Sequence, residues 1–353
     1  GVLFSVPLRR TMIVEDPLPF PEGKAAAEVL KAGENPGPGL KILAFSAAIG
    51  AFIKLAAASG LRMIPDNWAV AGFFGNGKGI AYLGTNLSPA LLGVGYIVGL
   101  NIGIVVLSGA VLSWHFAIPI YNAFFMGSDP ALAAQVAGAS AADTAFAIWS
   151  AKIRYLGVGA MLIGGVWTLF SLRKSLLSGI RSGFAAARKN TGEVVAETDR
   201  DLPMKWMLVA LVLFVIPLAF LYQAIVGQWL VAIPMTIIMI VAGFLFVSVS
   251  GYLAGLVGSS NNPVSGITIA TILFASVVLV LLLGRDSDKG AVAAIMIGAV
   301  VCCAAAVGGD NLQDLKAGYL VGATPWKQQL MLAIGAFSCA LIMAPVLNLL
   351  ASA

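Results

Sequence analysis

A polar segment at residues 258–266, with the sequence GSSNNPVSG, lies in the middle of a long apolar stretch. Its hydroxyls and amides can donate and accept hydrogen bonds, but they carry no charge. A proline directly before an apolar helix costs little, because the donor that it lacks would be unpaired at a helix start anyway. Polar side chains just before that helix can cap its free amides, and the positive end of the helix attracts carboxylates. The segment therefore has the chemistry needed to bind polar or anionic groups of a solute.

A second segment, residues 85–95 (TNLSPALLGVG), has a similar order of residue types. In both segments Ser or Asn comes first, then Pro, then an apolar helix with an early Gly, which suggests an internal repeat. Paired interrupted segments in two halves of a chain indicate the binding site of a transporter. The alternative is two ordinary interfacial turns, because Asn and Pro are also common loop residues. On the first interpretation the residues that contact solute are Asn86, Ser88, Pro89, Gly93, Gly95, Ser260, Asn261, Asn262, Pro263 and Ser265.

Ionisable residues within or beside the apolar stretches are few. Asp310 and Asp314 follow an apolar run and two glycines, where a partly buried carboxylate can carry a coupled proton. A solvated loop is the alternative for both. Lys54 lies in the middle of a predicted span and should face the bundle interior, although its long side chain can also reach the surface. His115 could relay protons, but an interfacial aromatic cluster with Trp114 is the favoured interpretation.

Other motifs argue against an enzyme. Residues 72–79 (GFFGNGKG) imitate a phosphate-binding loop, but Gly79 replaces the Ser or Thr that would bind magnesium, and no strand is expected before the motif. A flexible hinge before a helix is the favoured interpretation. The cysteines lie in apolar stretches without metal-binding spacing, and a single histidine cannot build a zinc site. No catalytic motif of the metalloprotease or hydrolase type is present, so we expect no enzyme, no cofactor and no resident metal.

Apolar helices must position these residues. The chain is 59% hydrophobic and 10% charged, whereas soluble domains carry about 25% charged residues, so the composition indicates a multi-pass membrane protein. The stretch from Trp206 to Gly284 contains no charged residue and is long enough for about three crossings of about 20 residues each. Interrupted backbone is tolerated at membrane depth only where protein or a watery cavity satisfies it. Three helices interrupted by residues 258–266 therefore indicate a transport pathway.

The predicted architecture is an all-α, polytopic transmembrane helical bundle of about nine spans, forming a single domain over residues 1–353. For residues 80–121 we favour two crossings, and the alternative is one tilted helix plus a re-entrant piece. Two crossings place loops 8–41, 173–205 and 309–327, which hold most basic residues, on one side, and the positive-inside rule makes that side cytoplasmic. The net charge of +5 fits this membrane-surface bias better than nucleic-acid binding. The predicted spans are 42–63, 80–100, 101–121, 150–172, 206–225, 229–252, 266–284, 290–308 and 328–350.

Four sequence blocks are similar to those of a known family. They are PFPEGKAAAEVLKAGE (19–34), NLSPALLGVGYIVGLNIG (86–103), GSSNNPVSGITI (258–269) and GDNLQDLKAGYLVGATPWKQQ (309–329). The chain resembles the oligopeptide transporter (OPT) family, which includes the yellow-stripe-like carriers of metal chelates. The blocks occur in family order and span most of the chain. Bacterial-type members resemble the chain more than plant carriers do, because residues 80–121 lack the plant-like sequence CPYIVN, which weakens the transfer of a metal–siderophore substrate.

The resemblance implies a proton-coupled secondary transporter for small peptides or metal chelates. It also implies missing helices at both ends, and residues 1–8 and 341–353 suggest a fragment of a longer protein without a visible signal peptide. We expect a carrier of the cytoplasmic (inner) membrane that works by alternating access, with the lipid bilayer and protons as partners and a homo-oligomer as an open alternative. A channel-like pore is the main alternative function. The candidates for coupling or gating are Glu22, Glu28, Asp310 and Asp314.

Overall fold

The computed structural model describes residues 1–34, 37–57, 63–161, 163–164, 167, 170, 196–284 and 288–352. It divides into two compact units. We call Gly1–Lys31 together with Gly164–Ala353 the helical unit, and Ala32–Ile163 the hairpin unit. Seven helices in the described part are long and apolar enough to cross a membrane, which confirms a polytopic membrane protein that is almost entirely helical.

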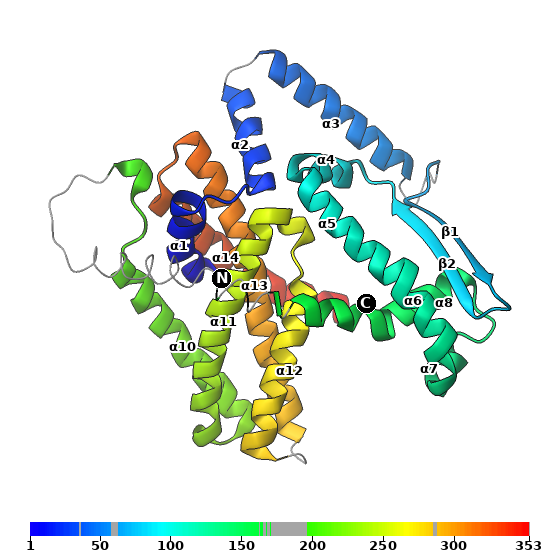
Figure 1. Cartoon of the computed structure of the whole chain (residues 1–353). Helices are drawn as coiled ribbons and strands as arrows, with labels where there is room; N and C mark the ends of the chain where they lie inside the picture. The colour runs from blue at the N-terminus through cyan, green and yellow to red at the C-terminus, as the bar shows by residue number, and fades with distance from the viewer. Residues whose placement is uncertain are drawn as a thin grey trace. The chain divides into compact units, whose positions relative to one another are not determined.

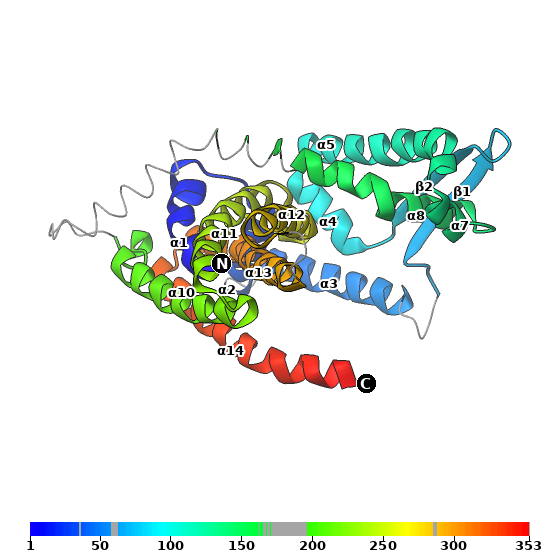
Figure 2. The ribbon, with the colours of Figure 1, turned by 90° about the horizontal axis from the view of Figure 1, so that it is seen from below.

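The helical unit is a bundle around two long helices, α11 and α13. Helix α13 packs against both α11 and α12, and Figure 2 shows these three helices end-on beside one another. Helix α1 lies on α11 and α13 and continues into a π-helical turn, η1. The elements are α1 (Val2–Arg9), η1 (Arg10–Glu15), α2 (Pro21–Glu34), η6 (Glu197–Asp199), α10 (Met204–Val226), α11 (Trp229–Val257), η7 (Ser259–Asn261), α12 (Val264–Leu283), α13 (Asp288–Val321) and α14 (Pro325–Ser352).

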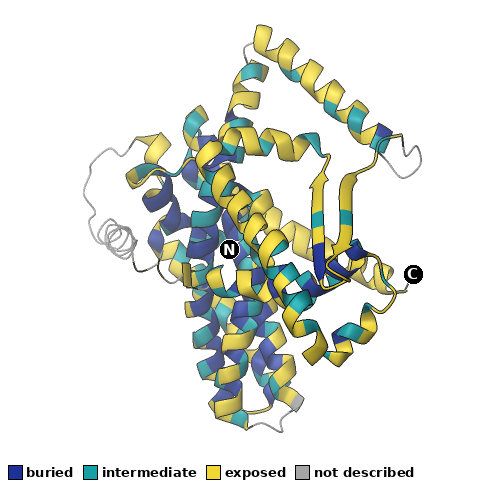
Figure 3. Ribbon diagram, turned by 45° about the vertical axis from the view of Figure 1, so that its right-hand side comes forward, coloured by how far each residue is buried: buried dark blue, intermediate teal, exposed yellow. Residues whose placement is uncertain are grey.

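Burial follows this arrangement. In the most apolar window of α11, 44% of the residues are buried inside the protein, against none in α14 and 6% in α3 of the hairpin unit. Figure 3 shows the buried residues concentrated in the central helices and mostly exposed residues on the others. Exposed apolar surface of this extent suits contact with lipid rather than with water.

A buried ion pair fixes the segment before α10 to α1 and α14. Arg9 is 1% exposed, and its guanidinium donates to Asp201 at 2.9 Å and to the carbonyl of Thr198 at 3.5 Å. Gln329, at the start of α14 and fully buried, donates to the second oxygen of Asp201 at 2.6 Å. The side-chain oxygen of Gln329 accepts from the backbone amide of Leu202 at 2.8 Å. Three segments of the helical unit are therefore linked by one polar cluster.

The hairpin unit begins with an apolar helix and a two-stranded antiparallel sheet. Strands β1 and β2 pair from Asn67 opposite Asn86 to Phe74 opposite Gly79. Helix α5 continues through π-helical and 3-10 turns as far as Ser128. The elements are α3 (Pro38–Ala57), β1 (Asn67–Phe74), β2 (Gly79–Asn86), α4 (Pro89–Val98), α5 (Leu100–Val111), η2 (Leu112–Ala117), α6 (Ile118–Ile120), η3 (Tyr121–Phe125), η4 (Met126–Ser128), α7 (Pro130–Gln135), α8 (Ala141–Ile148) and η5 (Trp149–Ile153).

The apolar run 206–284 is predicted correctly. Spans expected at 206–225, 229–252 and 266–284 correspond to α10, α11 and α12, and the span expected at 328–350 corresponds to α14. The expected span 42–63 corresponds to α3, Pro38–Ala57, and residues 58–62 of it lie outside the described residues. The expected span 150–172 lies partly outside the described residues, as does the basic loop 173–205 from residue 173 to residue 195.

The expected crossing at 80–100 is wrong. Residues 79–86 form β2, and the helix that follows, α4, has only ten residues. One helix in this region, Leu100–Ser128, is long enough to span, so the alternative of one helix plus a shorter piece is closer to the structure than two crossings. The break expected near Gly99 is confirmed, since this glycine separates α4 from α5 with φ +89°. The charge argument that depended on two crossings loses its basis.

The phosphate-loop imitation at residues 72–79 is the turn of the hairpin. A strand does precede it, contrary to expectation, and a second strand follows in place of the expected helix. Gly75, Asn76 and Gly77 all have positive φ, a conformation that Gly and Asn adopt more readily than other residues. The motif therefore makes a tight reversal and not a hinge before a helix.

The region expected as loop 309–327 is also different. Helix α13 runs without interruption from Asp288 to Val321, so residues 309–321 are helical. Asn311 and Gln313 are buried there, at 5% exposure each, although both are polar. The helix satisfies their backbone groups internally, which a loop packed inside the bundle could not do.

Candidate functional site

The polar segment after α11 is a true break between two helices. Gly258 ends α11 with φ +87°, a conformation that strains any other residue, and Ser259–Asn261 make a single 3-10 turn. Helix α12 begins at Val264. Its N-cap residue is Pro263, and no side-chain hydrogen bond caps the helix start. The expectation that Ser or Asn side chains cap this helix is therefore wrong, because these side chains bond elsewhere.

A carboxylate from α2 satisfies the free amides of the break. The backbone N–H of Ser259 donates to one oxygen of Glu22 and that of Ser260 to the other, both at 3.0 Å. The Ser259 hydroxyl also donates to Glu22. A Cβ at position 258 would lie 2.7 Å from the carboxylate, so Gly258 is required by space as well as by conformation.

The charge of Glu22 is stabilised by these contacts. Burial alone would raise the pKa of the Glu22 carboxyl, but the hydrogen bonds from Ser259 and Ser260 outweigh it and hold the pKa below its ordinary value of 4.5. Glu22 is therefore ionised at neutral pH and acts as a fixed negative charge beside the break.

The start of α2 is held in place independently of Glu22. The amide of Phe20 donates to the carbonyl of Gly255 on α11 at 2.8 Å. The amide of Gly23 donates to the side chain of Gln313 on α13 at 2.8 Å, and Gln313 donates to the carbonyl of Ala254 at 2.8 Å. A Cβ at Gly23 would clash with the backbone carbonyl of Gln313, so α2 and α13 touch closely here.

A second chain of hydrogen bonds runs from the break into α13. The Asn262 amide donates to the Ser250 hydroxyl at 2.6 Å, and that hydroxyl donates to the carbonyl of Ala305 at 2.5 Å. Gly309 makes room for this chain, because a Cβ there would lie 2.8 Å from the Asn262 nitrogen and 3.0 Å from the Ser250 oxygen. The side-chain oxygen of Asn262 is buried and accepts no hydrogen bond from the described residues.

Two further carboxylates approach the break from α13. Asp310 interacts with the Ser259 side chain and electrostatically with Glu22, and Asp314 interacts electrostatically with Asp310. Because α13 continues past both residues, they lie one turn apart on the same face, as expected for a continuous helix. Both side chains remain accessible. The structure therefore brings Glu22, Asp310 and Asp314 into one carboxylate cluster at the break.

The predicted site residues of the helical unit lie around this cluster. Ser260, Asn261 and Ser265 are exposed at the break, and Asn261 donates to the carbonyl of Val257 at 3.0 Å. Glu28 is different, since it lies on the exposed part of α2 and pairs with Lys31 at 3.1 Å. Sequence reasoning missed Ser259, Ser250 and Gln313 as members of the site. Ser259 could have been included because it belongs to the polar segment, but the other two give no local signal.

The predicted residues around Pro89 belong to the hairpin unit. Asn86 ends β2, and Ser88 precedes α4 without a side-chain capping bond, contrary to expectation. Gly93 and Gly95 lie on α4 in open space, since a methyl group added at either position would meet no atom within 4 Å. A strand precedes Pro89 whereas a helix precedes the break at Pro263, so the local elements around the two prolines differ.

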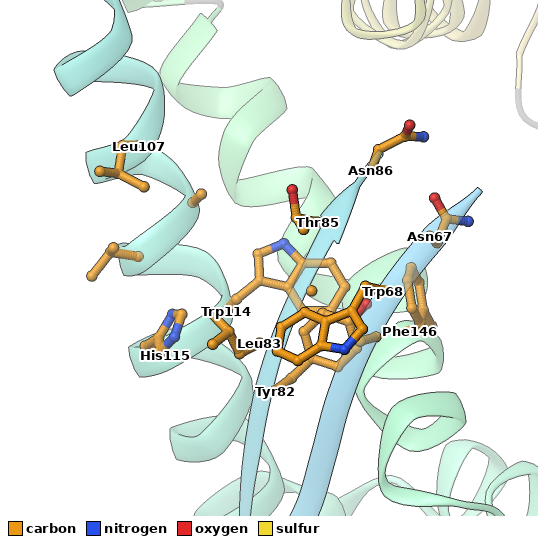
Figure 4. A pocket seen from close by; sticks show the side chains of 14 residues that line it. Asn67, Trp68, Tyr82, Leu83, Thr85, Asn86, Leu107, Trp114, His115 and Phe146 are labelled. Atoms are coloured by element: carbon orange, nitrogen blue, oxygen red, sulfur yellow. The ribbon is translucent and has the colours of Figure 1, made fainter. Parts of the chain in front are cut away.

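The hairpin unit has a pocket of about 610 Å³ between its two strands, α5 with the η2 turn that continues it, and α8. Figure 4 shows Asn67, Thr85 and Asn86 at one end of the pocket and the rings of Trp68 and Trp114 below them. Within the wall, the ring of Trp114 lies 4.6 Å from that of Tyr82 and 5.1 Å from that of Phe146, measured between centroids. His115 also lines the pocket, and its place in an interfacial aromatic cluster stays a prediction.

Three other sequence expectations concern Lys54, the cysteines and metal binding. Lys54 is not in the middle of a buried span. It lies in the last turn of α3, exposed, and pairs with Asp66 at 3.1 Å. The cysteines are free thiols, Cys303 and Cys339 being exposed and Cys302 half-buried. Among the described residues, no three His, Cys, Asp or Glu side chains are grouped so that they could hold a metal ion.

Apolar helices with a polar break that faces carboxylates define a multi-pass membrane protein with a polar site inside its bundle. The chain belongs to the oligopeptide transporter family, because the family model described as "OPT oligopeptide transporter protein" matches residues 1–353. It is 38% identical over 368 residues to a protein of Haemophilus influenzae named "Putative oligopeptide transporter". The match covers 99% of this chain and 56% of that relative, so the chain spans little more than half the length of the relative. No solved structure matches the chain. The family and this relative are transporters and not enzymes.

Proposed function

We propose that the complete gene product containing this chain imports small peptides across the cytoplasmic membrane by alternating access, driven by a proton gradient. The observation that carries the proposal is the break between α11 and α12, whose polar groups lie beside a cluster of three carboxylates. The family membership and the similarity to the Haemophilus influenzae relative support peptides as the class of solute.

The groups at the break match the groups of a peptide. The exposed side chains of Ser260, Asn261 and Ser265 can donate to a carboxylate or to peptide carbonyls, and the unpartnered oxygen of Asn262 can accept from a peptide N–H. The carboxylates of Asp310 and Asp314 can attract the ammonium group of a peptide. A solute with both charges and several amides therefore satisfies more of this site than an ion would.

The carboxylate cluster suits proton coupling. Asp310 interacts with both Glu22 and Asp314, and carboxylates that interact at short range do not all ionise together without cost. A carboxylate placed inside a membrane bundle is the usual carrier of a coupled proton. Asp310 occupies the centre of the cluster, so we assign the coupling proton to it, with Asp314 as the second carrier.

Uptake into proteoliposomes tests the proposal. The complete gene product is reconstituted, and accumulation of a labelled peptide library is measured with and without an inward proton gradient. A parallel series uses labelled peptide-like metal chelates, which carry similar carboxylates. We expect saturable accumulation of peptides that collapses when a proton ionophore is added. Flux that neither saturates nor exceeds equilibrium would show a channel and contradict the proposal, and preferential accumulation of chelates would replace peptides as the cargo.

Asp310→Asn tests the coupling residue. This variant should lose proton-driven accumulation but retain exchange of internal for external peptide, because exchange needs no net movement of protons. Glu28→Gln is the matched control, since Glu28 lies in an exposed ion pair on α2, apart from the cluster. If Asp310→Asn and Asp314→Asn both still concentrate peptide in response to a proton gradient, the coupling site lies elsewhere.

A further inference from the structure

One hydroxyl group lies between two carboxylates at the break. Ser259 donates its single hydroxyl proton to Glu22 on α2, while Asp310 on α13 approaches the same side chain. Both α11 and α13 pack against the turn that contains Ser259. A hydroxyl can donate once and accept twice, so the state of either carboxylate affects the bond to the other.

The break, and not α2, is the part that this hydroxyl can release. The start of α2 is fixed by the bonds of Phe20 to α11 and of Gly23 to α13, neither of which involves Glu22. The turn Ser259–Asn261 is held to α2 by the amides of Ser259 and Ser260 and by the Ser259 hydroxyl, all bonded to Glu22. Glu22 therefore has a fixed position, and these three hydrogen bonds attach the turn to it. We call the three hydrogen bonds the tether.

The protonation state of Asp310 decides how well the tether is formed. A protonated Asp310 can donate to the Ser259 oxygen while Ser259 donates to Glu22, so the three groups form an unbroken chain. An ionised Asp310 can only accept, so it competes with Glu22 for the one hydroxyl proton. Its negative charge also repels Glu22. Loss of the proton from Asp310 therefore removes one bond of the tether and adds repulsion.

We propose that Ser259 is the positioning residue of proton coupling: it ties the α11–α12 break to Glu22 when Asp310 carries a proton and lets the break separate when Asp310 is ionised. This inference rests on the proposed function for the identity of the coupling group. The proton moves between Asp310 and water, and no covalent bond to carbon changes.

The charged groups that interact with the carboxylate cluster lie on α2 and α13. Asp314 lies one turn further along α13 and adds negative charge. Lys24 on α2 and Lys316 on α13 supply positive charge and repel each other. Helices α11 and α12 and the turn between them contain no charged residue. The groups whose titration can change the hydrogen bond of Ser259 are therefore the carboxylates of the cluster.

Thiol labelling of the break tests the inference without any transport. In the complete gene product with every native cysteine replaced, single cysteines are placed at Asn261, in the turn, and at Ser265, in the first turn of α12. The maleimide labelling rate is measured from pH 5 to pH 8, and the ratio of the two rates cancels the intrinsic pH dependence of thiols. We expect the ratio of position 261 to position 265 to rise by about tenfold with pH, the size expected for losing one hydrogen bond to a charged group.

Four variants decide the outcome. Asp310→Asn keeps a donor toward Ser259 and should hold the ratio low at every pH, while Ser259→Ala should remove the pH response and Ser259→Thr should restore it. Glu28→Gln is the matched control and should keep the response, because Glu28 lies in an exposed ion pair with Lys31, apart from the cluster. A response that survives in Asp310→Asn or in Ser259→Ala overturns the inference, and so does a flat ratio in the parent. Proton-coupled uptake together with a labelling ratio that does not change with pH refutes this inference alone. A labelling ratio that rises with pH together with uptake that is not coupled to protons refutes the proposed function alone.

Discussion

The buried pair between Arg9 and Asp201 should be the most sensitive ionic contact of the helical unit. The Arg9 side chain is 2% exposed and that of Asp201 21% exposed, with 2.9 Å between them. Removing one partner of a buried pair leaves an uncompensated charge and costs about 3–5 kcal/mol. Among the described residues, Asp201→Ala leaves the guanidinium with the Thr198 carbonyl at 3.5 Å and Asp199 at 3.9 Å, and it also removes a partner of Gln329. We therefore expect a loss of about 3–5 kcal/mol in the free energy of unfolding.

Asp199 provides a matched control on the same segment. Its side chain is 59% exposed and lies 3.9 Å from Arg9, so Asp199→Ala should cost about 0–1 kcal/mol. The double variant Arg9→Met with Asp201→Leu should cost less than Asp201→Ala alone, because apolar side chains need no compensating charge. Unfolding of the complete gene product in detergent micelles by sodium dodecyl sulfate, followed by tryptophan fluorescence, measures all three. Equal losses for Asp201→Ala and Asp199→Ala would refute the reasoning.

Three further predictions concern the break. Gly309→Ala should lower stability by about 1–3 kcal/mol in the same assay, because its methyl group would press on Asn262 and Ser250. Gly335→Ala, whose methyl group would lie in open space, should have little effect. Equal effects would show that the close contact of Gly309 with Asn262 and Ser250 does not matter for stability. Asn262→Leu should leave membrane insertion intact but weaken peptide binding by about 1–3 kcal/mol, because a donor on the solute loses its acceptor. Normal peptide uptake by this variant would show that the break is an ordinary turn without a role in binding. The pKa of the Glu22 carboxyl is lowered in the folded state, so its contribution to stability is present above pH 4.5 and is lost as the pH falls through the lowered value. Glu22→Gln should remove that acid-induced loss of stability. An unchanged pH profile in this variant would contradict the assignment.

Local sequence signals explain which parts of the fold could be predicted. Helices α10, α11 and α12 follow from an uncharged stretch with glycines at the breaks, since Gly227, Gly258 and Gly284 all have positive φ at helix ends. The hairpin was missed because its strands are as apolar as a membrane span, and hydropathy does not separate the two. The Gly75–Gly77 turn carried the better signal, an Asn-Gly pair between two apolar runs.

The site was predicted only where its residues are close in sequence. The segment 258–266 and the carboxylates of α13 were found because they interrupt apolar sequence. Residues 309–321 were expected as a loop because they are polar, but their polar side chains serve contacts inside the bundle, as Gln313 does with Gly23 and Ala254. The contact of Glu22 with Ser259 joins positions 237 residues apart, and nothing in either local sequence indicates it.

That separation has a consequence for biosynthesis. Ribosomes add about 5–20 residues per second, so roughly 10–50 s pass between the synthesis of Glu22 and that of its partners at the break. During this interval the first helices of the helical unit lack the surfaces of α11 and α13 on which they later pack, and the whole hairpin unit is made in between. Residues 1–31 therefore cannot adopt their final packing until α11 and α13 have been synthesised. A membrane insertase or chaperone that shelters this early segment should influence the yield of folded protein more than one that acts on α14.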